Sequence, residues 1–381
     1  MIKTDFIIKE HIIRMRKYSS IVLSFLVYTL ATFYIGWNGW VWLQSFSSVQ
    51  SYGLYGAVVV ILAYTYFLGQ RFPSVLIFRI IGAYWFGFLQ YSLMILPISD
   101  LIVWVLTFTS VESATAIFVV GWITIGVFIF ILLLGTHNAY RPAVSFYRLH
   151  IPKKTNRKTL KIAMASDMHL GGLSGKSHLK RLVHMVNEME PDLILLPGDI
   201  VDDDSIFYIK KNMRDEMKKM KASIGIYGVI GNHEVYSGAV PEFVEEMKKS
   251  NVEILMDEVI KIEDSFYLVG RKDKTIHKRK SFSDLLENLD KSMPIIAMDH
   301  QPTDLQAAAD NGVDLLLCGH THRGQMAPNH LVTKRMYELD WGYKQKGSMH
   351  TIVSSGFGFW GPPLRLGSQS EIVQIEVTFR P

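Results

Sequence analysis

Two kinds of hydrophobic pattern divide this chain into a first and a second part. Between Ser20 and Tyr140, long apolar or aromatic stretches follow one another with few polar residues between them. Crossing the hydrocarbon core of a bilayer takes roughly 20 apolar residues in a helix. The stretches that reach or nearly reach this length are 20–43, 52–68, 80–107 and 113–134. They are apolar on all sides, whereas a helix of a soluble protein keeps a polar stripe. We therefore predict a transmembrane domain of about four helices over 20–140.

The number of spans has alternatives. The stretch 52–68 is the shortest, and 80–107 is long enough to tilt or to break near Pro97 and Asp100. Three or five spans are therefore alternatives to four. A cleaved signal peptide does not fit, because the first apolar run exceeds the usual length of about 7 to 15 residues and lacks a small-residue cleavage site.

The second part of the chain has the pattern of an α/β domain. From Leu160 onward, short apolar runs alternate with amphipathic segments, which is typical of strands and helices packed in layers. Strands are predicted at 161–165, 193–196, 226–230, 266–269, 295–298, 315–318, 350–353 and 372–377, and helices at 176–190, 208–221 and 241–249. The basic stretch 271–280 has no strand pattern, and we expect a solvated loop there, with phosphate binding as the alternative.

The charged residues predict how the chain is placed in a membrane. The formal net charge is +5, and the excess lies in a basic N-terminus, 1–19, and a basic linker, 141–158. Lys and Arg in short loops stay on the cytoplasmic side, and the loops 44–51 and 108–112 contain neither. We expect a multi-pass protein of the plasma membrane with both termini and the domain 159–381 in the cytoplasm; an odd number of spans would reverse this. Membrane lipids account for the basic edges, so no nucleic-acid partner is expected.

Three further residues bear on transport and on nucleophilic catalysis. Asp100 and Glu112 are acidic residues in the apolar half, and we place them near the outer interface or in a loop rather than on a transport path. The single cysteine, Cys318, excludes an internal disulfide, which is compatible with the cytosol. It ends an apolar strand, so we favour a packing role over that of a nucleophile.

Polar residues of metal-binding type occur just past the ends of five predicted strands. They are Asp167 and His169, Asp199, Asn232 and His233, His300, and finally His320 and His322. In open α/β sheets, ligands bind at the carboxyl ends of the strands. We therefore expect these side chains to meet at one edge of the domain.

The types of these residues favour a pair of divalent ions. Histidine nitrogens with carboxylate and amide oxygens, and no thiolate, suit manganese first, with iron or zinc as alternatives. Eight such groups exceed the needs of one ion, and a carboxylate can bridge two ions roughly 3.5 to 4 Å apart. Asp199 is the expected bridge, since Gly198 beside it lets the backbone approach closely. A hydroxide bridging the two ions would be the nucleophile.

These clusters resemble the calcineurin-like metallophosphoesterase family. The motifs that carry the resemblance are Asp167-Met168-His169, Gly198-Asp199-Ile200-Val201-Asp202, Gly231-Asn232-His233-Glu234, His300, and Gly319-His320-Thr321-His322. The resemblance implies a four-layer (αββα) sandwich. It also implies that one metal is held by Asp167, His169, Asp199 and His322, and a second by Asp199, Asn232, His300 and His320. His233 would contact phosphate or protonate the leaving group, with Asp202 or Glu234 in support.

The multi-span start and the later motifs resemble the membrane-associated branch that includes transmembrane metallophosphoesterases. These motifs are the segment 319–325, the segment Ser354 to Gly358, Arg365 and Glu371, and Arg323 stands where a glycine is usual. Part of this branch is similar to enzymes that cleave the nucleotide-sugar lipid UDP-diacylglucosamine. We therefore expect hydrolysis of a phosphate ester or anhydride, on a phosphorylated substrate that is lipid-linked, with no obligate protein partner.

Two other classes of function remain as alternatives. The first is a metal-binding membrane scaffold without catalysis, although the chain keeps His233 and every ligand of the pattern. The second is a transporter, which the scarcity of charges in the predicted spans disfavours.

Overall fold

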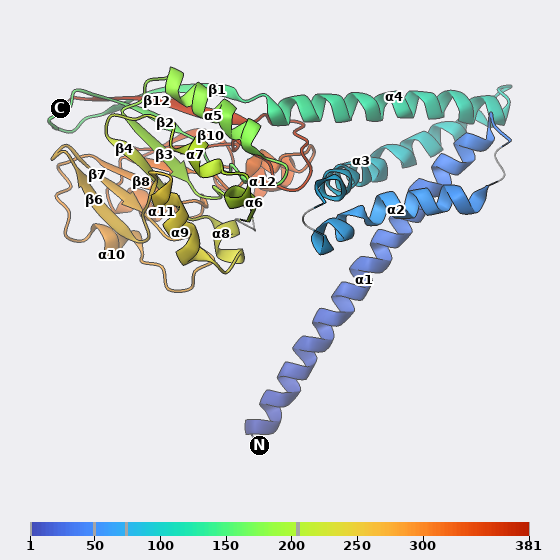
Figure 1. Cartoon of the computed structure of the whole chain (residues 1–381), viewed down its shortest axis with the longest axis horizontal. Helices are drawn as coiled ribbons and strands as arrows, with labels where there is room; N and C mark the ends of the chain where they lie inside the picture. The colour runs from blue at the N-terminus through green and yellow to red at the C-terminus, as the bar shows by residue number, and fades with distance from the viewer. Residues whose placement is uncertain (1, 49–50, 73–74, 203–205, 381) are drawn as a thin grey trace. The chain divides into compact units, whose positions relative to one another are not determined.

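The computed structural model describes residues 2–48, 51–72, 75–202 and 206–380, with side chains from Tyr18 onward. Contacts between residues divide the chain into two compact units, Met1–Leu132 and Leu133–Pro381. Figure 1 shows the helices and strands of both units, coloured from blue at the N-terminus to red at the C-terminus.

The first unit is helical. Its helices are α1 (Ile2–Gln44), α2 (Tyr52–Arg71), α3 (Leu76–Leu106) and α4 (Ser113–Tyr140), of which α4 continues into the second unit. Each of the four contains an apolar stretch long enough to cross a membrane, within the part of the chain that the structure describes. Helix α3 passes through Pro97 without a break. The prediction of four spans is therefore confirmed by length and composition.

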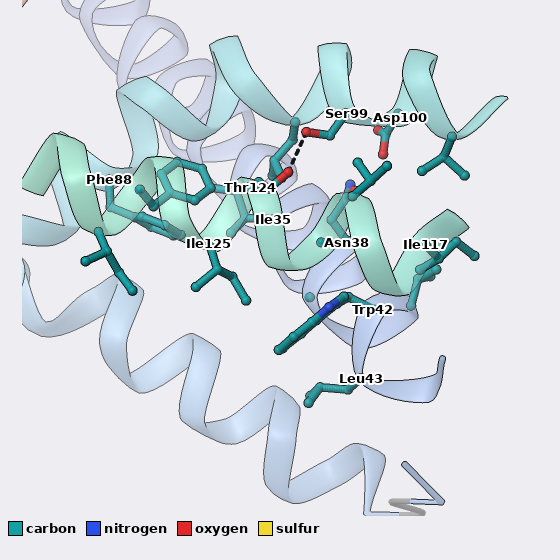
Figure 2. Close-up of a pocket in the computed structure, with 18 of the residues that line it drawn as sticks. Ile35, Asn38, Trp42, Leu43, Phe88, Ser99, Asp100, Ile117, Thr124 and Ile125 are labelled. Atoms are coloured by element: carbon teal, nitrogen blue, oxygen red, sulfur yellow. Dashed lines mark hydrogen bonds between the residues drawn. The ribbon is translucent and has the colours of Figure 1, made fainter. Parts of the chain in front are cut away.

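Small residues let these helices pack closely. A Cβ atom at Gly82 would lie only 2.4 Å from Cα of Tyr66, so the backbones of α2 and α3 nearly touch. A cavity of about 550 Å³ lies between α1, α3 and α4 and is lined mostly by apolar side chains (Figure 2). Ser99 and Thr124 are hydrogen-bonded at 2.8 Å beside it. Asp100, which also lines it, accepts a hydrogen bond from the Tyr34 hydroxyl at 2.5 Å.

The second unit contains two sheets, each of six strands among the described residues. The first runs β1 (Ala143–Ile151), β12 (Glu371–Phe379), β2 (Thr159–Met164), β3 (Leu193–Pro197), β4 (Gly225–Val229), β5 (Glu253–Ile254). The second runs β10 (Gly342–Lys346), β11 (Met349–Val353), β9 (Leu315–Cys318), β8 (Ile295–Met298), β7 (Phe266–Gly270), β6 (Glu258–Ile262). Strands β2 to β5 are parallel, as are β7, β8, β9 and β11. The strands that precede the predicted ligands thus run in a common direction within each sheet.

Helices that pack on the outer faces of the two sheets are α5 (Lys176–Glu188), α6 (Ile206–Lys210), α7 (Met213–Met217), α9 (Val240–Lys249), α10 (Phe282–Leu286) and α11 (Leu305–Asp310). The connecting segments contain α8 (Asn232–Tyr236), the 3₁₀ turn η1 (His322–Gly324) and α12 (His330–Met336).

Three buried apolar clusters define the layers. One lies between the sheets and includes Ile162 and Ile296. The second joins the first sheet to α5, α7 and α9, and the third joins the second sheet to α10 and α11. The result is helix, sheet, sheet and helix in succession, as expected for the αββα sandwich. Cys318 lies fully buried in the third cluster, which agrees with a packing role.

Three segments differ from expectation. The segment expected as a basic linker, 141–158, contains β1, which pairs in parallel with β12. Arg148, the one Lys or Arg of this strand, is exposed and lies 3.3 Å from the Glu376 carboxylate of β12. The single helix expected at 208–221 is instead α6 and α7. They are separated at Asn212, whose left-handed backbone (φ 51°) interrupts the helix.

The basic stretch 271–280 is a loop without a strand, as predicted, but it is only partly solvated: Lys274, His277, Lys278 and Lys280 are exposed, whereas Arg271 is buried. The Arg271 guanidinium is buried and lies 2.7 Å from the Asp299 carboxylate and 3.1 Å from that of Asp304. Arg279 contacts the same two carboxylates, at 3.1 and 2.7 Å. Because a buried charge needs a partner, the two aspartates explain the burial. Both arginines are committed to these ion pairs, which argues against phosphate binding by Arg271 and Arg279.

Candidate metal centre

The candidate residues meet where both sheets end. Asp167 and His169 follow β2, Asp199 follows β3, and Asn232 begins α8 just after β4. From the second sheet, His300 follows β8, while His320 and His322 follow β9. All seven side chains expected to bind metal are thus brought together from five loops.

One group of donors is formed by Asp167, His169 and His322. Their ligand atoms lie within 4.8 Å of one another. His169 Nε2 is 3.0 Å from His322 Nε2, which in turn is 3.6 Å from Asp167 Oδ1. Two imidazole nitrogens at this distance cannot both carry a proton, so at least one presents a lone pair to its neighbour.

A second group is formed by Asp199, Asn232, His300 and His320. His300 Nε2 lies 3.2 Å from Asp199 Oδ2 and 3.1 Å from Asn232 Oδ1. His320 Nδ1 lies 2.8 Å from the same Asn232 oxygen. The Nδ1 atom of His300 is 2.9 Å from the Pro197 carbonyl. Since a carbonyl only accepts, His300 Nδ1 donates and Nε2 is the atom left to face the group.

Asp199 lies between the two groups. Its Oδ2 atom is 3.2 Å from His300 Nε2 in one group and 3.8 Å from His169 Nε2 in the other. Its Oδ1 atom accepts a hydrogen bond from the backbone N–H of His233 at 3.0 Å. This is the position expected for a carboxylate that is shared by two ions.

The backbone around these residues is strained. Five of the predicted ligands have positive φ angles, between 42° and 74°: Asp167, His169, Asp199, His320 and His322. A non-glycine residue in this region costs roughly 1–3 kcal/mol, and such residues cluster at functional sites. Gly198 has φ 83°, and a Cβ there would lie 2.6 Å from His300 Nδ1. The glycine therefore permits the close approach that was expected beside Asp199.

His233 lies at the edge of the donor cluster. Its Nε2 atom is 4.0 Å from Asp199 Oδ2, and its Nδ1 atom is 4.0 Å from Asp202 Oδ1. Its ring meets that of His169 edge to face at 4.6 Å between centroids. His233 thus has a carboxylate near each ring nitrogen, and with His169 and Asp199 it forms a third group whose possible ligand atoms lie within 4.8 Å of one another.

Glu234 joins two of the loops. Its fully buried carboxylate accepts hydrogen bonds from the backbone N–H groups of Asp199 (3.1 Å), Val201 (3.0 Å) and Gly231 (2.7 Å). Glu234 therefore fixes the loop after β3 against the loop after β4. It acts on the backbone, and Asp202, not Glu234, is the carboxylate beside the His233 ring.

Burial and the charges of neighbouring groups shift the pKa values of the side chains in the cluster. Burial raises the pKa of Asp167 to about 6. Burial opposes ionisation of Asp199, but the nearby His300 lowers its pKa below the ordinary value. Burial would lower the pKa of His300, but the Asp199 carboxylate raises it well above the ordinary value. Burial lowers the pKa of His320 to about 4. Asp199 and His300 therefore form an ion pair when no other cation is present.

The donor set fits divalent cations. Asp167 Oδ2 is buried and forms no hydrogen bond with any described residue, which leaves an anionic oxygen without a partner. A Cβ at Gly319 would lie 2.2 Å from this oxygen, so only glycine leaves room for it. Nitrogen and oxygen donors without a thiolate suit manganese, iron or zinc.

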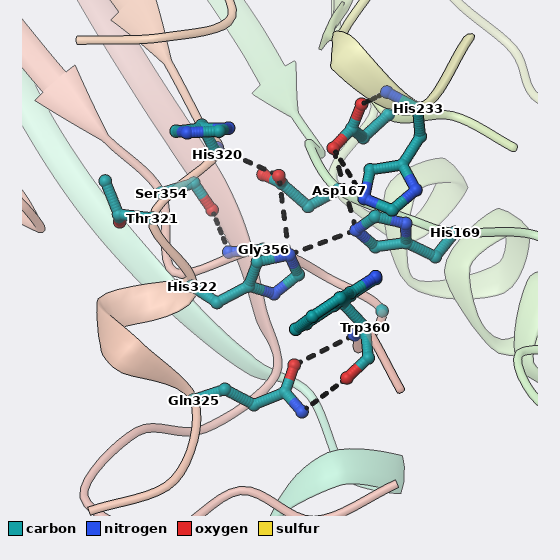
Figure 3. A network of polar contacts seen from close by, with 12 residues as sticks. Asp167, His169, His233, His320, Thr321, His322, Gln325, Ser354, Gly356 and Trp360 are labelled. Atoms are coloured by element: carbon teal, nitrogen blue, oxygen red, sulfur yellow. Dashed lines mark hydrogen bonds and ion pairs between the residues drawn. The ribbon is translucent and has the colours of Figure 1, made fainter. Parts of the chain in front are cut away.

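The cluster opens into a cavity of about 310 Å³. It is lined by Asp199, Asn232, His233, Tyr236, His320, His322 and Trp360. Tyr236 and Trp360 are exposed aromatic residues that sequence reasoning did not single out. The Trp360 ring lies 6.3 Å from that of His233 between centroids, and Figure 3 shows the Trp360 backbone bonded to Gln325. No motif marks Trp360, since only the folded loop brings it to the cavity.

Two arginines lie near the site, one in contact with a predicted ligand and the other in a different pocket. Arg365 is fully buried, and its Nη2 atom lies 3.1 Å from His322 Nδ1. Arg323 lines a different pocket, of about 400 Å³, and its guanidinium stacks over Trp341 at 4.0 Å. The arginine that replaces the usual glycine is thus not among the residues that line the metal-site cavity.

A family model and several known proteins match this part of the chain. A family model for calcineurin-like phosphoesterases matches residues 160–324, which include every predicted ligand. The chain is 33% identical over 243 residues to an uncharacterized metallophosphoesterase of Helicobacter pylori strain J99, covering 62% of this chain and 64% of that protein. It is 30% identical over 261 residues to an uncharacterized metallophosphoesterase of Aquifex aeolicus, covering 65% of this chain and 97% of that protein.

A vertebrate protein with a membrane part is also similar. The "transmembrane protein with metallophosphoesterase domain" of Bos taurus is 30% identical over 265 residues, covering 64% of this chain and 59% of that protein. The matched region therefore spans less than two thirds of the Helicobacter and Bos taurus proteins and nearly all of the Aquifex protein.

Proposed function

The chain belongs to the calcineurin-like phosphoesterase family, and on this premise we propose that it is a membrane-anchored, two-metal phosphoesterase. The proposed reaction is hydrolysis of a phosphate ester or phosphoanhydride bond. One observation carries the proposal: six nitrogen and oxygen donors from four other loops surround Asp199, with His233 beside them at the cavity.

The residues divide into two sets of ligands. Asp167, His169, Asp199 and His322 would hold one ion; Asp199, Asn232, His300 and His320 would hold the other. When bound, a pair of divalent ions supplies an activated water and neutralises charge on the phosphoryl group. Manganese is the proposed metal, with iron or zinc as alternatives.

The chain's own residues bind the phosphoryl group and move a proton. His233 reaches the cavity and lies 4.0 Å from Asp202, a carboxylate that can orient its ring. We assign His233 to contact with the phosphoryl oxygens and to proton donation to the leaving oxygen. Glu234 keeps His233 and Asp199 in register through its three backbone hydrogen bonds.

Placement in the membrane is the second part of the proposal. Four apolar helices and the positive-inside distribution of basic residues support a multi-pass protein of the plasma membrane with the phosphoesterase domain in the cytoplasm. The substrate would be a phosphorylated, lipid-linked molecule, because tethering raises the effective concentration of the site near membrane-borne substrates.

Hydrolysis by the full-length chain tests the proposal. The protein in detergent would be given manganese with p-nitrophenyl phosphate or bis-p-nitrophenyl phosphate, and compared with Asp199→Asn. We expect turnover by the native chain and none by the variant. A native chain that binds manganese yet has no more turnover than Asp199→Asn would support the scaffold alternative instead.

A further inference from the structure

Exposed apolar side chains occur on α12 and at Trp360, which lines the metal-site cavity. Leu331, Val332 and Met336 of α12 and Trp360 have 62%, 58%, 69% and 59% of their surface exposed. We call these four residues the apolar rim. No residue of α12 is buried, so this helix adds nothing to the core of its unit. Large apolar residues that are exposed together mark an interaction surface.

The apolar rim is connected to the end of α4 by hydrogen bonds. The backbone N–H of Arg365 donates to the Gly135 carbonyl at 2.9 Å, and Asn138 Nδ2 donates to the Arg365 carbonyl at 3.1 Å. The carbonyl of the next residue, Leu366, accepts a hydrogen bond from the backbone N–H of Ala327 at 2.7 Å. Ala327 lies three residues before α12. The loop that follows Trp360 therefore links the last turns of α4 to the start of α12.

The same loop is held at Trp360 itself. Gln325 Oε1 accepts a hydrogen bond from the Trp360 backbone N–H, and Gln325 Nε2 donates to the Trp360 carbonyl, both at 2.9 Å (Figure 3). Gln325 Nε2 also donates to the Pro362 carbonyl at 2.9 Å. Trp360 is therefore fixed relative to α4 and α12, although its ring is exposed.

The length of α4 places this end at the membrane surface. Helix α4 has 28 residues, or about 42 Å at 1.5 Å per residue. Its apolar run ends at Leu134 and is followed by Thr136, His137 and Asn138. Since the hydrocarbon core needs roughly 20 residues, Gly135 and Asn138 lie at the level of the lipid headgroups. The loop bonded to them lies at the same level.

The composition of α12 matches that environment. Arg335 shares a helix face with Leu331 and Val332, and Met336 shares one with Val332, because residues three and four positions apart lie side by side. Lys334 and Arg335 are exposed and form no ion pair with any residue that the structure describes. Apolar residues flanked by basic ones are typical of a helix at a membrane interface, where Trp is also enriched.

We infer that the apolar rim contacts the bilayer surface from which α4 emerges, and that the metal-site cavity opens in the headgroup layer. Trp360 belongs both to the rim and to the cavity wall that includes His233. A phosphate group carried on a lipid then reaches the metal site without leaving the membrane surface. This part of the inference rests on the proposed phosphoesterase function, whereas the contact with the bilayer does not.

Accessibility of spin labels tests the contact directly. Leu331→Cys and Met336→Cys would each be made in the full-length chain, labelled with a nitroxide, and placed in nanodiscs of phosphatidylethanolamine and phosphatidylglycerol. The native Cys318 is fully buried in β9 and does not compete for the label. Glu287→Cys, an exposed position after α10, is the matched control. Collisions with oxygen, which concentrates in hydrocarbon, are compared with collisions with a water-soluble nickel chelate.

We expect the oxygen-to-nickel collision ratio at both rim positions to be severalfold higher than at the control. A ratio equal to that of the control would overturn the inference, because the rim would then face water. Protection from both reagents would also overturn it, because a protein partner would then cover the rim. The measurement uses no substrate, so a result against the membrane contact does not bear on the proposed hydrolysis. A result against hydrolysis does not bear on the membrane contact either.

Discussion

The guanidinium of Arg365 is fully buried and places Nη2 3.1 Å from Nδ1 of His322. The same side chain donates to the carbonyls of Gly356 and Gly358. A guanidinium has no acceptor, so Nδ1 of His322 accepts in this contact and Nε2 faces His169. Arg365 therefore orients a predicted metal ligand and also donates hydrogen bonds to the buried carbonyls of the loop that leads to Trp360.

Replacing Arg365 should weaken metal binding. Arg365→Met removes the contact to His322 and leaves buried carbonyls without donors, so we expect manganese affinity to fall roughly 10- to 100-fold, measured by titration calorimetry. The exposed Arg148→Met on β1 is the matched control and should bind manganese as the native chain does. Native-like affinity in folded Arg365→Met would show that the contact does not orient His322.

Replacing His233 should separate catalysis from metal binding. His233→Ala removes the proposed proton donor but none of the ligands, so turnover of p-nitrophenyl phosphate should fall roughly 10²- to 10⁴-fold. Metal content, measured by mass spectrometry, should stay unchanged. His184→Ala, on the exposed face of α5, is the control and should keep full turnover. Loss of metal from His233→Ala would mean that this histidine is a ligand.

Stabilisation by metal should increase with pH. Burial raises the pKa of Asp167 from 3.8 to about 6, and the pKa of His300 is raised by Asp199. A group whose pKa is raised by folding stabilises the metal-free fold at low pH, and this contribution is lost as pH rises through the folded pKa. Bound metal must displace these protons.

The rise in unfolding temperature caused by manganese should therefore be larger near pH 8 than at about pH 5. Thermal unfolding with manganese, compared at each pH with the same protein in a chelator, measures this difference. An equal rise at both pH values would show that metal binding releases no proton from Asp167 or His300.

The membrane orientation is testable with one new cysteine. Ser177 is exposed near the start of α5, and Cys318 is buried, so Ser177→Cys provides a single reactive thiol. An impermeant maleimide should label it only after the cells are permeabilised. Labelling in intact cells would place the domain outside and would favour an odd number of membrane crossings.

Much of the centre could be predicted from the sequence because its signals are local. Each ligand follows a short apolar run, and the runs before Asp199 and His320 form β3 and β9, where the pattern predicted strands. The direction of parallel strands then brings the clusters together. The long apolar runs similarly predicted α1 to α4, since their composition suits only a membrane.

The remaining features depend on contacts that are distant in the sequence. The burial of Arg271 follows from Asp299 and Asp304, and no local pattern links these residues. Strand β1 was expected as part of a basic linker, since basic residues flank it in the sequence and no local pattern indicates its pairing with β12. Trp360 is brought to the cavity by hydrogen bonds from Gln325, which its neighbours in the sequence do not indicate.

The number and position of bound ions test the account most directly. Crystals soaked in manganese would be measured for anomalous scattering. We predict two peaks, one on each side of the Asp199 carboxylate and roughly 3.5 to 4 Å apart, with His300 and His320 at one and His169 and His322 at the other. A single peak, or none with these side chains turned away from Asp199, would contradict the two-metal centre.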